Sequence, residues 1–148
     1  MSIYSEKAVN NFKTGYNCAQ SVFLAFAEDF GLDKETALKL SSSFGGGMGR
    51  LREVCGTVSS MFAIAGLKEG YTSPNDDEIK ALHYELIQKL AEEFKSQTGS
   101  YICRDILGLE QEKDVPIPSK RTEEYYEERP CENCIKIASQ IIEKNLLK

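Results

Sequence analysis

The chain has 148 residues, a formal net charge of −5 at pH 7 and a pI near 5.0. This length suits one domain, so we expect residues 1–148 to form a single helical domain that buries roughly 70% of the unfolded chain's surface. The acidic balance argues against nonspecific binding to nucleic acid or to an anionic membrane. No run approaches the roughly 20 apolar residues that span a bilayer, and the N-terminus shows no signal peptide. The sequence therefore predicts no membrane insertion and a cytoplasmic location.

The spacing of apolar residues is helical almost throughout, and no stretch shows the sustained alternation of a strand. We expect an all-α, single-domain bundle of five to six helices. A short first helix is expected over residues 5–12. Asn17 caps a second helix that begins at Cys18 and stops at Gly31, and Asp33 starts a third.

A glycine loop over residues 44–50 follows the third helix. The next segment, 54–67, is apolar or small on every face, so we expect it to form the central buried helix. Ser73 and Pro74 predict the start of the longest helix, which Gly99 ends. The expected core positions of this helix are Ile79, Leu82, Leu86, Leu90 and Phe94.

The last third of the chain contains two expected helices separated by a charged segment. A short helix begins at Cys103 and is closed by Gly108. Residues from about 109 to 129 predict a surface segment, with one turn of helix near Tyr125 in a solvated loop. A final helix begins at Cys131. Its expected core positions are Ile135, Ala138, Ile142 and Leu146.

Four of the five cysteines fall where a helix is expected to begin. These are Cys18, Cys55, Cys103 and Cys131. The unpaired N–H groups and the partial positive charge of a helix N-terminus stabilise a thiolate over a thiol. Helix starts from different hairpins can meet at one end of a bundle, so we expect the four cysteines to form one catalytic site. Free cysteine is also often a buried apolar residue, and any one of the four fits that role.

These cysteines allow three interpretations. The first is a thiol-redox protein in which Cys55 attacks as a thiolate, favoured by the nearby basic residues Arg50 and Arg52, and exchanges with a redox partner protein or a small thiol. In the second, Cys18, Cys55, Cys103 and Cys131 are metal ligands and hold an iron–sulfur cluster or zinc. The third is a helical interaction protein whose cysteines pack in its core. The sequence leaves a homo-oligomer open in each case.

Cys131 and Cys134 have CxxC spacing, which suits a redox disulfide or metal chelation. There is no βαβ pattern of the thioredoxin kind and no second CxxC for a zinc ribbon. Cys134 lies one turn inside the last helix, beside Ile135, where we expect an apolar setting and no role in the chemistry.

The glycine loop is the other candidate for a binding role. It lacks the Lys-Ser/Thr ending of a P-loop and follows a helix instead of a strand, so neither nucleotide-binding fingerprint fits. Its N–H groups at Gly46 and Gly47, with Arg50 and Arg52, could support an anion or a thiolate. A flexible connection between two helices fits the same residues equally well.

The order of these motifs along the chain resembles one known family. The segments are Asn17-Cys18-Ala19-Gln20-Ser21-Val22, Ser43 to Arg50, Cys55-Gly56, Cys103-Arg104, and Cys131 with Ile135 and Ala138. They resemble the putative redox-active proteins known by the signature C_GCAxxG_C_C. The resemblance implies that Cys18, Cys55, Cys103 and Cys131 are the four defining cysteines and that Cys134 is an addition. Thr57 and Ser60 depart from the CGAxxG element, where the family has Ala and Gly.

Overall fold

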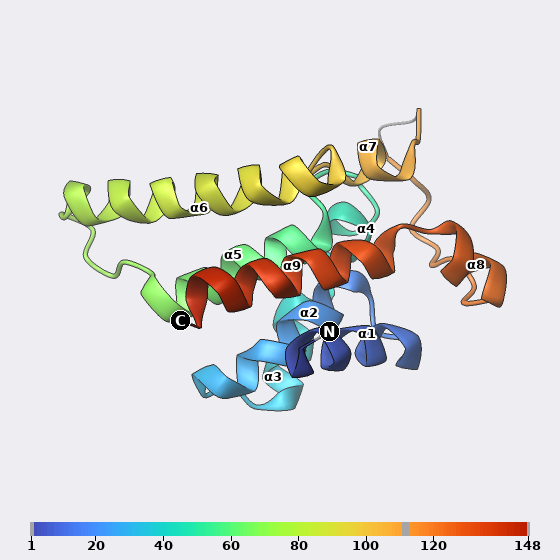
Figure 1. Ribbon diagram of the computed structural model, residues 1–148, viewed down its shortest axis with the longest axis horizontal. Helices are drawn as coiled ribbons and strands as arrows, with labels where there is room; N and C mark the ends of the chain where they lie inside the picture. Colours follow the sequence, from blue (N-terminus) through green and yellow to red (C-terminus); the bar gives the residue numbers. More distant parts are fainter. Residues whose placement is uncertain (1, 111–112, 148) are drawn as a thin grey trace.

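The computed structural model describes residues 2–110 and 113–147, and Figure 1 shows their arrangement. The longer helices are α1 (Ile3–Thr14), α2 (Cys18–Ala27), α3 (Lys34–Ser42), α5 (Gly56–Glu69), α6 (Asp77–Thr98) and α9 (Cys131–Leu146). The shorter ones are the 3-10 turn η1 (Glu28–Phe30), α4 (Gly45–Met48), α7 (Cys103–Leu107) and α8 (Glu123–Glu128). The all-α prediction is confirmed. The predicted count of five to six helices is too low, because short helices such as α4 and α8 add to the longer ones.

Helices α2, α5 and α9 form the centre of the molecule. Helix α1 packs on α2 and α9, and α6 lies across α5 and α9 (Figure 1). The core positions expected on α9 are buried. The largest fully buried side chains come from all of these helices. They are Phe12, Val22, Phe23, Phe26, Met61, Ile64, Leu90, Phe94, Ile135, Ile141, Ile142 and Leu146.

The start of α6 differs from the prediction. The Asp76 carboxylate accepts a hydrogen bond from the backbone N–H of Ile79 at 3.0 Å, so Asp76 is the N-cap and the helix begins at Asp77. Ser73 and Pro74 lie outside the helix. An aspartate placed directly before an acidic first turn both satisfies a free N–H and favours the positive end of the helix dipole.

The predicted core stripe of α6 is only partly correct. Leu90 and Phe94 are buried, whereas Ile79 is 49% exposed and Leu82 is 61% exposed. The first turns of α6 extend past the ends of α5 and α9 in Figure 1, which agrees with the exposure of these two side chains. A homo-oligomer stays a prediction.

Two chain segments that lead into cysteines are joined by an isolated antiparallel bridge between Val54 and Ile102. The backbone N–H of Cys103 donates to the carbonyl of Glu53 at 2.6 Å. The bridge therefore holds the residues just before Cys55 and Cys103 side by side, although they are far apart in sequence.

In the part of the chain that the structure describes, no helix combines the length and the apolar character needed to cross a membrane.

Candidate functional site

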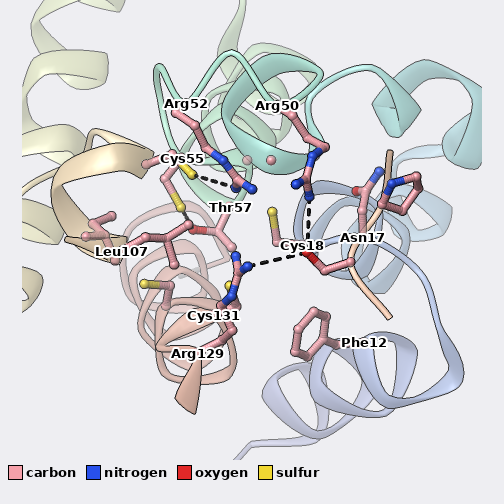
Figure 2. Close-up of a pocket in the computed structure, with 18 of the residues that line it drawn as sticks. Phe12, Asn17, Cys18, Arg50, Arg52, Cys55, Thr57, Leu107, Arg129 and Cys131 are labelled. Carbon is pink, nitrogen blue, oxygen red and sulfur yellow. Dashed lines mark hydrogen bonds between the residues drawn. The ribbon is translucent and has the colours of Figure 1, made fainter. Parts of the chain in front are cut away.

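A pocket of about 190 Å³ lies where α2, α5, α7 and α9 begin (Figure 2). All five cysteines line it. Cys18, Cys103 and Cys131 are the first residues of α2, α7 and α9, and Cys55 is the N-cap of α5. The structure thus places the four predicted cysteines at helix starts and around one pocket. It adds Cys134 from the second turn of α9.

Cys55 is the thiol that this pocket acidifies. Its side chain is buried, yet its pKa is lowered to about 7. The largest cause is a hydrogen bond with the Cys134 thiol, which outweighs the opposing effect of burial. The Thr57 hydroxyl, 3.1 Å from Cys55 Sγ, and the backbone N–H groups of Thr57 and Val58 lower the pKa further. Hydrogen bonds donated to a thiolate stabilise it over the neutral thiol.

Cys134 was expected to lie in an apolar setting with no role in the chemistry; the structure places it in the lining of the pocket, and its role stays a prediction. Its side chain is 2% exposed and within hydrogen-bond reach of Cys55. The pKa of Cys134 is raised far above its usual value, first by this hydrogen bond and then by burial. At neutral pH, Cys134 is therefore the protonated donor and Cys55 the acceptor.

A helix start does not by itself produce a thiolate. Burial raises the pKa of Cys18 far above its usual value, even though the backbone N–H of Gly46 donates a hydrogen bond to it. Burial also raises the pKa of Cys103, and it raises the pKa of Cys131 to about 11. In these positions the cost of removing a charge from water exceeds the stabilisation from the helix dipole.

Arg50 and Arg52 line the pocket together with Cys55, and their role in supporting a thiolate stays a prediction. Arg52 Nη1 donates to Cys103 Sγ at 3.5 Å, and both guanidinium groups contact the Asp114 carboxylate at 3.1 Å. Arg50 and Arg52 have left-handed backbones with φ of 68° and 59°, which are strained for residues with a Cβ. The low pKa of Cys55 comes mainly from Cys134, Thr57 and backbone N–H groups instead.

The glycine segment forms a structured turn around α4. Gly46 and Gly47 have left-handed backbones with φ of 70° and 68°. Gly46 lines the pocket and donates to Cys18. Gly47 packs against Cys103, where an added Cβ would come within 2.5 Å of the Cys103 Cβ. Gly46 therefore faces the thiol of Cys18, and Gly47 provides close packing.

The segment 109–129 lies on the surface as predicted: none of its described residues is buried, and the expected turn of helix near Tyr125 is α8. It also contributes pocket residues that the sequence did not place there, namely Ser119, Arg121 and Tyr125. Arg121 lies over the Phe12 ring, 4.5 Å from its centroid, and donates to the Phe12 carbonyl at 2.9 Å. Arg129, just before the last helix, lines the pocket as well. The one sequence feature that could have indicated these pocket residues is the pair Arg121 and Arg129, which flank the acidic helix α8.

A metal centre would need several ligand side chains around one point. Among residues 2–110 and 113–147, no three Cys, His, Asp or Glu side chains are placed to hold a metal ion. Cys55 is hydrogen-bonded to Cys134 and Thr57, and Cys103 to Arg52, so these two sulfurs have protein partners in this structure.

Residues 16–145 match the family model described as "Putative redox-active protein (C_GCAxxG_C_C)". The chain belongs to this family. The matched range contains all five cysteines and every arginine that lines the pocket. No curated protein and no solved structure matches the chain.

The two departures from the family's CGAxxG element have structural roles. Thr57 places its hydroxyl 3.1 Å from Cys55 Sγ, a contact that an alanine could not make. The Ser60 hydroxyl donates to the Ala19 carbonyl at 2.6 Å and joins α5 to α2. Thr57 therefore contributes to the acidity of Cys55 in this member of the family.

We predict that Gly56→Ala will destabilise the protein by about 1–3 kcal/mol, because the new methyl group overpacks α5 against α2. Its Cβ would lie 2.7 Å from Cys18 Sγ and 2.8 Å from the Phe44 carbonyl oxygen. Gly66→Ala is the matched control on the same helix, since a Cβ there has no neighbour within 4 Å. The control should be stabilising by about 0.5–1 kcal/mol. Urea unfolding of both variants measures this, and equal effects would contradict the close contact at Cys18.

Proposed function

We propose that this protein reduces a small disulfide, with Cys55 as the attacking thiolate and Cys134 as the resolving thiol. The observation that carries the proposal is the Cys55 thiol, whose pKa is about 7 and whose main hydrogen-bond donor is a second thiol. A thiol that titrates near neutral pH combines a high thiolate fraction with good nucleophilicity. Membership of a redox-active family agrees with this chemistry.

The reaction has two exchange steps. The Cys55 thiolate attacks one sulfur of the substrate disulfide, the substrate S–S bond breaks, and one substrate thiolate leaves as the mixed disulfide forms. Cys134 then loses its proton to solvent or to the leaving thiolate and attacks Cys55 Sγ. This step forms a Cys55–Cys134 disulfide and releases the second substrate thiol. Two electrons pass from two protein thiols to the substrate, which becomes two thiols.

The ionisation of Cys134 changes during this sequence. Its pKa is raised mainly by its hydrogen bond to the Cys55 thiolate. Once Cys55 is in a mixed disulfide, that thiolate is gone and the main cause of the raised pKa is removed. Cys134 is thus held protonated until it is needed. We assign Cys18, Cys103 and Cys131 to shaping the pocket in this reaction, and their direct participation stays a prediction.

The substrate is proposed to be a small molecule, not a protein disulfide. Cys55 is 7% exposed, and its pocket has a volume of about 190 Å³. This is below the roughly 300–1,000 Å³ of pockets for drug-sized ligands. All five cysteines are free thiols, which is the state that a reducing compartment such as the cytoplasm maintains.

Oxidation of the reduced protein by a small disulfide without oxygen tests the proposal. We predict that the number of free thiols will fall from five to three, because two of the five cysteines form one disulfide. Peptide mapping should identify Cys55 linked to Cys134. A different pair would contradict the assignment of the resolving thiol.

Metal analysis and an absorbance spectrum of protein purified without oxygen complete the test. A stoichiometric metal or cluster bound through the cysteines would overturn the proposal in favour of the metal-binding interpretation. Thiols that resist alkylation below pH 8 would instead favour an interaction protein with packing cysteines.

A further inference from the structure

The pocket is strongly basic in a chain whose net charge is −5. Four of the five arginines of the chain line it, and no Asp or Glu of the described segments does. The four are Arg50, Arg52, Arg121 and Arg129. A pocket walled by one sign of charge raises the local concentration of ligands of the other sign.

The surrounding carboxylates do not balance this charge. Asp114 is shared by Arg50 and Arg52. Arg121 is held by the backbone carbonyls of Phe12 and Tyr16, both at 2.9 Å. Within residues 2–110 and 113–147, neither Arg121 nor Arg129 forms an ion pair. One Cys55 thiolate still leaves the pocket with an excess of positive charge.

Two of the arginines converge on one neutral oxygen. Arg50 Nη1 donates to Ser119 Oγ at 3.3 Å, and Arg129 Nη2 donates to the same oxygen at 3.4 Å. Figure 2 shows Arg50 entering from one side of the pocket and Arg129 from the opposite side, with Cys18 between them. A hydroxyl cannot neutralise two guanidinium groups, whereas an oxyanion at this position would bind both with charge-assisted hydrogen bonds.

Arg52 supplies a second, independent observation. Its side chain is 3% exposed and lines the pocket. Its Nε is buried without a hydrogen-bond partner among the described residues. Buried guanidinium N–H groups are normally satisfied, because an unmade hydrogen bond to a charged group is costly. A ligand acceptor in the pocket would remove this deficit.

We propose that the pocket selects anionic substrates: a small disulfide that carries a carboxylate or a similar oxyanion group, which Arg50 and Arg129 bind beside the Cys55 thiol. This inference rests on the proposed disulfide reduction and names its substrate class. Binding of the anionic group between the two arginines holds the disulfide within the pocket that contains the attacking sulfur. The proposal involves no further redox step.

Three aliphatic disulfides of similar length and different charge test the selection. Dithiodipropionate is a dianion, bis(hydroxyethyl) disulfide is neutral and cystamine is a dication. The readout is the ratio of the second-order rate for the dianion to that for the neutral disulfide at pH 7 and low salt. Any change in the Cys55 thiolate fraction cancels in this ratio. We expect a ratio of at least about 10 in the native protein and the slowest reaction with cystamine. The ratio should fall as salt is added.

Two arginine variants distinguish binding of the anion at Arg129 from a general effect of the protein's charge. Arg129→Gln should lower the ratio at least about threefold. Arg104→Gln removes the one arginine that lies outside the pocket lining, where it pairs with Glu53 at 3.2 Å, and should leave the ratio unchanged. The urea-unfolded chain, which carries the same net charge, should show no preference for the dianion.

The outcomes for substrate charge and for redox function are distinguishable. If all three disulfides react at similar rates, or if Arg129→Gln leaves the ratio unchanged, the anion selection is wrong and disulfide reduction stands. If no disulfide reacts, the proposed function fails, and anion binding is then measured by calorimetry with suberate, the sulfur-free analogue of dithiodipropionate. Suberate binding that Arg129→Gln weakens would support the anion site, and no suberate binding to the native protein would overturn it.

Discussion

Replacing Cys55 with serine should slow the reaction of the reduced protein with a small disulfide at pH 7 by about 100-fold. Cys55, with a pKa of about 7, is about half ionised at that pH. Cys131, with a pKa of about 11, is ionised to roughly one part in 10⁴. The more basic thiolate is intrinsically more nucleophilic, and this offsets nearly half of the difference on a logarithmic scale. A difference of about 100-fold in rate remains.

Stopped-flow measurement of thiol release checks this result, with far-UV circular dichroism and urea unfolding of Cys55→Ser to confirm that the variant folds. Cys131→Ser is the control variant, because Cys131 also lies at a helix N-terminus but has a raised pKa. A Cys55→Ser protein that reacts at the native rate would contradict the assignment of the nucleophile. A 100-fold lower rate in Cys131→Ser, together with a native rate in Cys55→Ser, would identify Cys131 as the nucleophile instead.

The second large effect concerns the pH at which Cys55 becomes reactive. Alkylation of Cys55 should be half-maximal near pH 7, because its pKa is about 7. Cys134→Ala removes the largest stabiliser of the thiolate, so the pKa rises and the profile moves to higher pH. Thr57→Val removes a smaller contribution and should move the profile in the same direction by less.

Peptide-resolved alkylation between pH 5 and 9 measures these profiles. Cys134→Ser keeps a hydroxyl donor near Cys55 and should stay closer to the native profile than Cys134→Ala. Ile137→Val, a truncation on the same helix outside the pocket lining, controls for lost packing and should not move the profile. An unchanged profile in Cys134→Ala would show that the contact does not set the acidity of Cys55.

The helix starts were accessible from the sequence because they depend on local chemistry. Asn17 caps α2 through its own side chain, and glycine ends several helices through its left-handed backbone. The convergence of four cysteines followed from these starts together with the geometry of a bundle. The contact of Cys55 with Cys134 could not be predicted, because it depends on how far α5 and α9 are shifted along each other, which no local pattern encodes.

The role of the charged segment 109–129 in lining the pocket could not be predicted for a related reason. Charge in a sequence indicates a solvated surface unless a partner is known, and the partners here are distant in the chain. Asp114 pairs with Arg50 and Arg52, and Arg121 binds carbonyls in and after α1. The ionisation of the thiols was also only partly accessible, because burial depends on the whole fold and outweighs the helix dipole at Cys18 and Cys131.

The proximity of Cys55 and Cys134 links oxidation to folding. A disulfide between them would join α5 to α9 and close a loop of roughly 80 residues, which lowers the entropy of the unfolded chain by an amount worth about 4.5 kcal/mol at 25 °C. Because the linkage is thermodynamic, the folded protein favours the oxidised pair by the same amount relative to the unfolded chain. The oxidised form should therefore unfold at a higher denaturant concentration than the reduced form. The unfolding midpoint would then report the redox state of the Cys55–Cys134 pair.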